Sequence, residues 1–225
     1  LALEGVKTDN LGSFNYLGRE MANIPSAPFS RIAEVEKIVL FGSETNEDNA
    51  VVGYMIRQAV YRRRALLTVV TNKPKDSMAR KANKVVRIQS YEGLIAATDE
   101  YLRSAKSVPE EAVAFAKVLC DQNFLIVCSE KYISPKAQKQ LYDLIIAAGK
   151  DPEKCLIVLR EKNNSMGLLQ LGFGKKDLLS KLNEGSLRNI FVFGEDPVGC
   201  AFDKKKVKEW ISTADFVVVQ DHFMT

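Results

Sequence analysis

Two apolar runs near the end of the sequence are each followed by polar residues that could bind a ligand. The runs are residues 189–193 and 216–219, and neither alternates with polar residues, which is typical of parallel strands covered on both faces. The polar residues that follow them are Gly194, Glu195, Asp196, Pro197, Gln220 and Asp221. Because ligands of open α/β sheets bind beyond the carboxyl ends of the strands, we interpret these loops as a candidate site. The carboxylates could hydrogen-bond an amino-bearing ring, and turn or helix-cap chemistry is the alternative.

A similar loop, residues 42–49, follows the apolar run 37–41 and precedes a helical pattern. Free backbone N–H groups and the helix dipole favour an anion at this position. The loop lacks both the Gly-x-Gly-x-x-Gly spacing and the P-loop Gly-Lys-Ser/Thr, so a plain connecting loop is the alternative. The candidate ligands here, including those after the next predicted strand, are Gly42, Ser43, Thr45, Asn46, Asn72 and Lys73.

A third polar stretch, residues 163–167, presents Asn164 and Gly167, which could offer amide and backbone groups to a ligand. A connecting loop explains it equally well.

The single histidine, His222, follows a predicted strand, where a structural role is the more common one. No nucleophile-base pattern such as Gly-x-Ser-x-Gly occurs, and no pair of histidines could bind a metal. We therefore predict no catalytic residues.

The composition indicates an ordinary globular chain. Of its 225 residues, 46% are hydrophobic and 27% charged, and the net charge is +4. Short basic runs at 62–64 and 204–206 favour solvated helix faces, so we predict neither nucleic-acid binding nor membrane insertion.

The four cysteines have no paired spacing that would hold an iron-sulfur cluster or zinc. The absence of a signal peptide and of a disulfide framework favours the cytoplasm.

Apolar runs alternate with helical patterns along most of the sequence, which predicts an α/β fold. The expected strands are 37–41, 66–70, 85–88, 124–128, 156–159, 189–193 and 216–220. We predict doubly wound, mostly parallel sheets with helices on both faces, in two Rossmann-like lobes. Residues 1–29 form an irregular first segment, 30–160 the first lobe, and 161–225 part of an incomplete second lobe. A long loop is expected over 160–174, a short helix over 77–83, and helix starts at Ser134 and Asp203.

Taken together, the loops resemble those of the molybdopterin oxidoreductase family, which includes formate dehydrogenases and the related large subunit of NADH-quinone oxidoreductase. The stretches 192–197 and 218–225 look like the family's Gly-Glu-Asp/Asn-Pro and Val-Gln-Asp-x-Phe-x-Thr motifs. Residues 37–53 are similar to its first strand-loop-helix, and Asn163, Asn164, Gly167 and Gly172 to its Asn-x-x-Gly loop. The family's Asp-Pro-Arg is replaced by Asn72-Lys73-Pro74, and its metal-ligating cysteine is missing near Ser13, which leaves that serine a remote metal candidate.

The resemblance implies a central fragment of a redox subunit that binds molybdopterin guanine dinucleotide in its parent protein. We expect no cofactor in the isolated fragment, which would be inactive alone, and partners among other domains and subunits of a redox complex. The expected location is the cytoplasm, including the cytoplasmic face of a membrane complex. Two alternatives are a structural scaffold domain that has lost the cofactor and an ordinary nucleotide-binding α/β enzyme.

Overall fold

The computed structural model describes residues 8–14, 16–17, 21–104, 107–162, 164–171, 173, 176–201 and 203–222. The chain divides into two compact units. One unit comprises Ile24–Asn163, and the other combines Leu1–Asn23 with Asn164–Thr225. We refer to them as the inserted unit and the discontinuous unit. The unit boundaries differ by a few residues from the divisions expected after residues 29 and 160, and residues 1–23 group with the carboxy-terminal part.

The inserted unit is built from five strands and the helices that connect them. Its elements are η2 (Phe29–Ala33), β1 (Lys37–Phe41), α1 (Thr45–Asp48), α2 (Ala50–Arg63), β2 (Leu66–Thr71), η3 (Ala79–Lys81), β3 (Lys84–Arg87), α3 (Tyr91–Ser104), α4 (Glu110–Cys120), β4 (Phe124–Ser129), α5 (Pro135–Ala147), α6 (Pro152–Cys155) and β5 (Leu156–Leu159). The expected strands are all present, with bounds that shift by a residue at most at either end.

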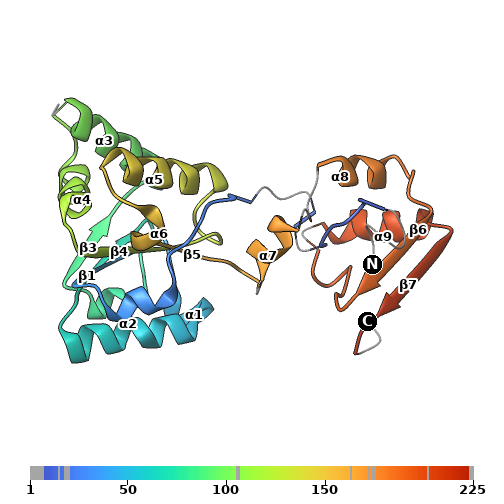
Figure 1. Ribbon diagram of the computed structural model, residues 1–225, viewed down its shortest axis with the longest axis horizontal. Coiled ribbons are helices and arrows are strands. Elements are labelled where there is room, and N and C mark those ends of the chain that lie inside the picture. Colours follow the sequence, from blue (N-terminus) through green and yellow to red (C-terminus); the bar gives the residue numbers. More distant parts are fainter. Residues whose placement is uncertain are drawn as a thin grey trace. The chain divides into compact units, whose positions relative to one another are not determined.

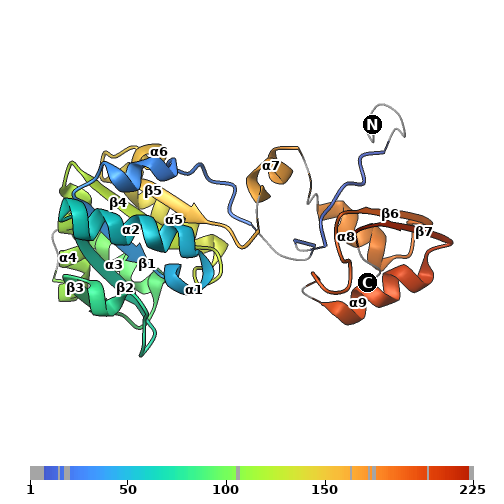
Figure 2. The ribbon, with the colours of Figure 1, turned by 90° about the horizontal axis from the view of Figure 1, so that it is seen from below.

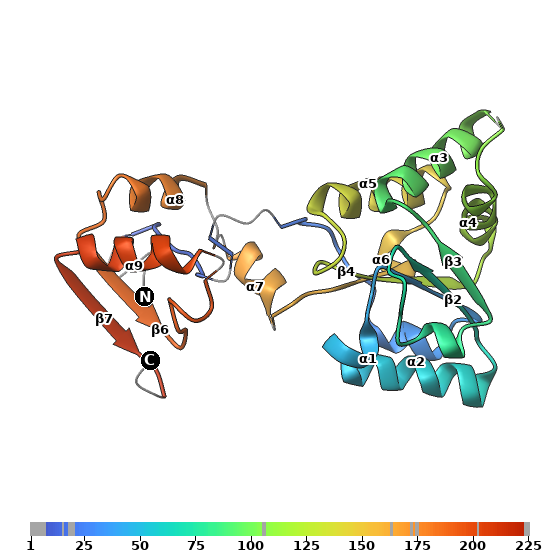
Figure 3. The ribbon, with the colours of Figure 1, turned by 180° about the vertical axis from the view of Figure 1, so that it is seen from behind.

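The five strands of this unit form one parallel sheet in the order β3-β2-β1-β4-β5. Helix α2 lies on one face, and α3, α4 and α5 lie on the other (Figures 1 and 3). The chain therefore winds in both directions from the centre, and the predicted doubly wound α/β fold is confirmed. The change of direction lies between β1 and β4, which is where ligands of such sheets usually bind.

Side chains of β1 alternate between the two layers of the core, because successive residues of a strand point to opposite faces. Ile38 and Leu40 belong to the cluster that includes Val52 and Ile56 of α2. Phe41 points the other way, and its ring lies 5.2 Å from the ring of Tyr91 and 5.2 Å from that of Phe115, measured between centroids. The central strand is thus buried on both sides, as its unbroken apolar sequence predicts.

The discontinuous unit holds a smaller sheet of two parallel strands. Its elements are α7 (Ser165–Gln170), α8 (Lys176–Asn183), β6 (Asn189–Phe193), α9 (Lys204–Thr213) and β7 (Phe216–Gln220). Ile190 and Val192 of β6 pack with Leu182 of α8 and with Val207 and Trp210 of α9. Both helices therefore cover the same face of the strand pair (Figure 3).

Two local predictions differ from the structure. The loop expected over 160–174 contains the short helix α7, whose single turn and a half is too brief to show a periodic pattern. The helix expected over 77–83 is a three-residue 3-10 turn, η3. By contrast, the predicted helix starts at Ser134 and Asp203 are confirmed, since each side chain accepts a hydrogen bond from the first turn of its helix.

No helix among the described residues is long and apolar enough to cross a membrane.

Candidate functional site

The loops that follow β1, β2 and β4 meet at the carboxyl edge of the five-stranded sheet. The first group of predicted site residues, Gly42, Ser43, Thr45, Asn46, Asn72 and Lys73, lies in the first two of these loops. Because β2, β1 and β4 are adjacent in the sheet, their ends are brought together as the strand order requires. The structure therefore gathers this group at one edge of the inserted unit.

Gly42 allows the first loop to turn tightly against the loop after β4. Its φ is +59°, a left-handed conformation that side chains disfavour. A Cβ atom at this position would lie 2.8 Å from Cγ1 of Ile133 and 2.9 Å from Cζ of Tyr91. Ile133 thus fills the space directly beside the switch point between β1 and β4.

Glu44 ties the first loop to the loop after β2. Its carboxylate accepts hydrogen bonds from the backbone N–H of Ser77 at 3.2 Å and from the hydroxyl of Ser77 at 2.9 Å, and it lies 3.4 Å from Nζ of Lys73. Burial lowers the pKa of Lys73, but Glu44 and Tyr132 outweigh this effect, so the pKa is raised. The lysine therefore stays charged beside a carboxylate whose side chain is only 5% exposed.

Asp48 ties the first loop to the loop after β4. Its carboxylate accepts hydrogen bonds from Lys131 and from the hydroxyl of Tyr132. Burial raises the pKa of Asp48, but these two hydrogen bonds outweigh it, and the pKa is lowered. Nζ of Lys73 also lies 3.8 Å above the Tyr132 ring, within the range of a cation–π contact. We call Glu44, Asp48, Lys73, Lys131 and Tyr132 the edge network.

Two hydroxyls of the first loop have no hydrogen-bond partner among the described residues. Ser43 is 4% exposed and Thr45 is fully buried. An unsatisfied buried hydroxyl costs about 1–3 kcal/mol, so such groups are uncommon in folded proteins. Asn46 is different, because its side-chain oxygen accepts a hydrogen bond from Arg57 of α2.

The sequence prediction missed four members of the edge network, namely Glu44, Asp48, Lys131 and Tyr132. Glu44 and Asp48 lie in the loop that was singled out, and the other two follow β4 within three residues of its end. Ligands bind beyond the carboxyl ends of parallel strands, and this rule applies to Ser129–Tyr132 as it does to the first loop. The position of Lys131 and Tyr132 after an apolar run could therefore have revealed them.

In the discontinuous unit, the predicted residue Glu195 binds the amino-terminal segment. Its carboxylate accepts hydrogen bonds from the Ser13 hydroxyl at 2.7 Å and from the backbone N–H of Phe14 at 3.1 Å. The two residues, Ser13 and Glu195, are therefore brought together, although 182 positions separate them. This contact helps to explain why residues 1–23 group with the end of the chain.

The carboxylate of Asp196 stabilises the loop in which it lies. Its Oδ1 atom accepts hydrogen bonds from the backbone N–H groups of Val198 at 3.0 Å and Gly199 at 2.7 Å. A Cβ atom at Gly199 would overlap Oδ2 of Asp196, so a side chain there would displace this carboxylate. The turn chemistry named as the alternative accounts for this carboxylate.

The remaining predicted residues of this group also have structural partners. Gly194, with φ of +61°, donates its backbone N–H to the carbonyl of Gln220 at 2.8 Å, while Pro197 is buried. The carboxylate of Asp221 accepts a hydrogen bond from the backbone of His222. Residues Asn163, Gly172 and Thr225, which complete the motifs quoted above, lie outside the described residues.

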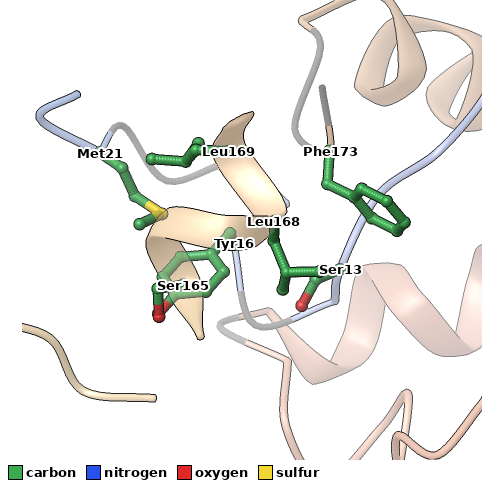
Figure 4. Close-up of a pocket in the computed structure, with 7 residues that line it drawn as sticks. All are labelled: Ser13, Tyr16, Met21, Ser165, Leu168, Leu169 and Phe173. Atoms are coloured by element: carbon green, nitrogen blue, oxygen red, sulfur yellow. The ribbon is translucent and has the colours of Figure 1, made fainter. Parts of the chain in front are cut away.

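Asn164 and Gly167 lie at the start of α7, beside a small pocket. Asn164 has a left-handed φ of +59°, and a Cβ at Gly167 would overlap its Oδ1 atom. The pocket is just large enough for one water molecule. Its lining is mostly apolar and consists of Ser13, Tyr16, Met21, Ser165, Leu168, Leu169 and Phe173 (Figure 4). The hydroxyls of Tyr16 and Ser165, two of these lining residues, are hydrogen-bonded to each other.

Neither unit assembles a metal centre from its described residues, and two of the four cysteines are buried. No group of three or more His, Cys, Asp or Glu side chains is placed to hold a metal ion among them. Burial raises the pKa of Cys128 to about 12 and that of Cys155 to about 11, so neither is a thiolate near neutral pH.

The face of the β6–β7 pair opposite to α8 and α9 carries three exposed phenylalanines. Phe191, Phe193 and Phe216 are each more than half exposed, and the rings of Phe191 and Phe216 make an edge contact at 6.0 Å. These residues share the face opposite to Ile190 and Val192, since the register pairs Asn189 with Phe216. We call Phe191, Phe193, Phe216 and the half-buried Val218 the aromatic face.

Comparison with known proteins shows the fold and no family. No protein-family model matches the sequence, and no curated protein matches it. A chain of the formyltransferase/hydrolase complex FhcABCD from Methylorubrum extorquens, solved in complex with methylofuran, has a similar structure. The two chains share 11% sequence identity with a TM-score of 0.58, over 90% of this chain and 62% of that chain.

The expected membership of the molybdopterin oxidoreductase family is wrong by this comparison, because the structural neighbour belongs to a formyltransferase/hydrolase complex. The same finding overturns the predicted role in a formate dehydrogenase or in NADH-quinone oxidoreductase, and with it the electron-transfer function. The motifs behind the prediction have local causes. Gly194, Asp196 and Gly199 allow or stabilise the backbone conformation of one tight turn, and Gly42 allows that of another. The cofactor expectation stays an untested prediction.

Proposed function

We propose that this chain is a non-catalytic subunit that binds a partner protein through the aromatic face of β6–β7. The observation that carries the proposal is the exposure of Phe191, Phe193 and Phe216 on one side of a parallel strand pair. Parallel sheets are almost always covered on both faces. Here α8 and α9 cover the opposite face, and no helix of the described residues covers this one.

The occupant that fits this face best is an apolar helix of a partner subunit. Helices are the elements that cover parallel strands, and aromatic side chains are enriched in the cores of protein interfaces. Covering a half-exposed phenylalanine stabilises a complex by about 1 kcal/mol, so three such rings make a substantial anchor. The fold likeness to a chain that belongs to a complex is in keeping with this role.

The test is purification of the tagged protein from its natural source, followed by native mass spectrometry. We expect a stoichiometric complex for the wild type and its loss in the double variant Phe191→Ser, Phe193→Ser. In the reconstituted complex, amide exchange should slow in residues 189–193 and 216–220. The variant Ile146→Ser, at an exposed position of α5 in the inserted unit, is the control, and it should keep the partner. A monomer, a complex of identical copies, or a partner that survives the double substitution would contradict the proposal.

A second candidate function is the binding of a small anion at the edge network. It is favoured by the buried hydroxyls of Ser43 and Thr45, which lack partners among the described residues and lie in a strand-end loop. Phosphate or a phosphate monoester could accept hydrogen bonds from both hydroxyls and pair with Lys73, provided that the contact between Asp48 and Tyr132 opens.

Phosphorus NMR and thermal unfolding in inorganic phosphate test this second function. Phosphate should raise the unfolding temperature of the wild type at constant ionic strength, and the effect should disappear in Ser43→Ala with Thr45→Val. Ser180→Ala, at an exposed position of α8, is the matched control. An equal response of all three proteins would indicate a general salt effect and rule out this site.

A further inference from the structure

Helix α2 carries an exposed face of tyrosine, valine and arginine in the inserted unit. Tyr54 and Tyr61 are each more than half exposed, and Val51 is 74% exposed. Figure 2 shows this unit from the side of α2, with no other helix or strand crossing in front of the helix. We define the tyrosine–arginine face as Val51, Tyr54, Arg57, Gln58, Tyr61 and Arg62, which lie on the side of α2 away from the buried residues Val52, Ile56 and Ala59.

The composition of this face is unusual for the outer side of a sheet-covering helix. Such a side normally carries charged and polar residues. Helix α2 contains Arg57, Arg62 and Arg63 but no aspartate or glutamate. Tyrosine and arginine are the residues most often found at the energetic centre of protein interfaces. A face that combines aromatic rings with positive charge is suited to binding a partner protein.

The polar groups on this face are only partly used within the protein. Lys81 of the neighbouring segment donates a hydrogen bond to the Tyr61 hydroxyl at 2.6 Å and adds a further positive charge. Arg57 is bound to Asn46. The Tyr54 hydroxyl and the Arg62 guanidinium have no partner among the described residues, and the Oε1 atom of Gln58 is buried without one in that same part of the chain.

The acidic residues of neighbouring elements leave this charge uncompensated. Asp48, on the short helix before α2, is already bound by Lys131 and Tyr132. Glu34, next to η2, is paired with Arg31 at 2.5 Å. Glu47 lies at the amino-terminal end of the face, far from the arginines of the last turn. The carboxy-terminal half of the face is therefore cationic.

We propose that the tyrosine–arginine face binds an acidic, amphipathic segment of a partner protein. Carboxylates of that segment would pair with Arg62 and Lys81, and its apolar side chains would cover Val51 and the tyrosine rings. A nucleic acid fits less well, because a phosphate backbone is held by many cations and two of the three arginines of α2 are already engaged, Arg57 by Asn46 and Arg63 by the carbonyl of Ala33. This surface is separate in sequence and chemistry from the aromatic face.

Fluorescence anisotropy with synthetic peptides tests the proposal. The probe is a labelled peptide in which Glu and Leu recur at helical spacing, and its match has each Glu replaced by Gln. We expect binding of the Glu peptide alone, weakened by salt. Tyr54→Ala with Tyr61→Ala, or Arg62→Glu, should each reduce the affinity about tenfold or more, as for other interface anchors.

The control variant is Lys139→Glu, which makes the same charge change at an exposed position of α5 on the other side of the sheet. It should bind the Glu peptide as the wild type does, and circular dichroism should show that all variants fold. Absence of binding, equal affinity in the face and control variants, or tighter binding of a single-stranded oligonucleotide would overturn the proposal. Phe191→Ser with Phe193→Ser should leave peptide binding unchanged, so its outcome is independent of the proposed function.

Discussion

The hydroxyl of Tyr132 hydrogen-bonds the carboxylate of Asp48 across the switch point between β4 and β1. The two residues are 84 positions apart, and the contact joins the two loops that would have to separate if a ligand were to enter between them. Together with the bond from Lys131 to the same carboxylate, it holds these two loops together.

Replacing Lys73 with Met should destabilise the inserted unit by about 1–3 kcal/mol, because the buried carboxylate of Glu44 loses its cation. Glu44→Gln in the same protein should recover much of that loss. Urea unfolding followed by far-UV circular dichroism measures both. If the two single substitutions were additive in the double variant, Lys73 and Glu44 would not interact energetically.

Stability in acid should depend on Asp48. The folded-state pKa of Asp48 is lowered from 3.8, so the unfolded chain binds the proton more readily. Its stabilising contribution is complete above that ordinary value and is lost as the pH falls through the lower folded value. The difference in unfolding free energy between wild type and Asp48→Asn should shrink as the pH decreases in this range. A difference that stays constant with pH would argue against an ionised Asp48 in the folded protein.

Gly42→Ala should be far more destabilising than Gly149→Ala. Both glycines have positive φ, +59° and +74°, so both substitutions carry backbone strain of about 1 kcal/mol. Only at Gly42 does the added methyl meet Ile133 and Tyr91, whereas nothing lies within 4 Å at Gly149. Thermal unfolding of the two variants should therefore give clearly different midpoints, and equal midpoints would mean that the first loop relaxes freely.

Thiol labelling should distinguish the cysteines. Cys120 is exposed and should react with iodoacetamide at pH 8 in the folded protein. Burial raises the pKa of Cys128 to about 12, so Cys128 should react only after unfolding. Mass spectrometry after timed labelling shows the order. Early modification of Cys128 would indicate that β4 is exposed by local opening.

The fold followed from the sequence more directly than the function did. Unbroken apolar runs such as that of β4 give buried parallel strands, and Ser134 and Asp203 mark helix starts by local chemistry. The pairing of Asp48 with Tyr132 depends on strand order, which no single stretch of sequence contains. The motif around Glu195 misled because glycine, aspartate and proline in a turn satisfy geometry that many proteins share.

The path of the chain through the two units bears on how the protein folds as it is synthesised. The inserted unit holds both of its ends together, since Ala27 donates to the carbonyl of Leu156 at 2.7 Å and Val158 donates to Ser26 at 3.2 Å. Once that unit has folded, residues 1–23 and the segment after 163 start from neighbouring points. Its folding therefore already accounts for most of the entropy lost in closing the long loop between Ser13 and Glu195. During synthesis the amino-terminal segment can pair with Glu195 only after the end of the chain has been made, and a variant that slows folding of the inserted unit should also slow folding of the discontinuous unit.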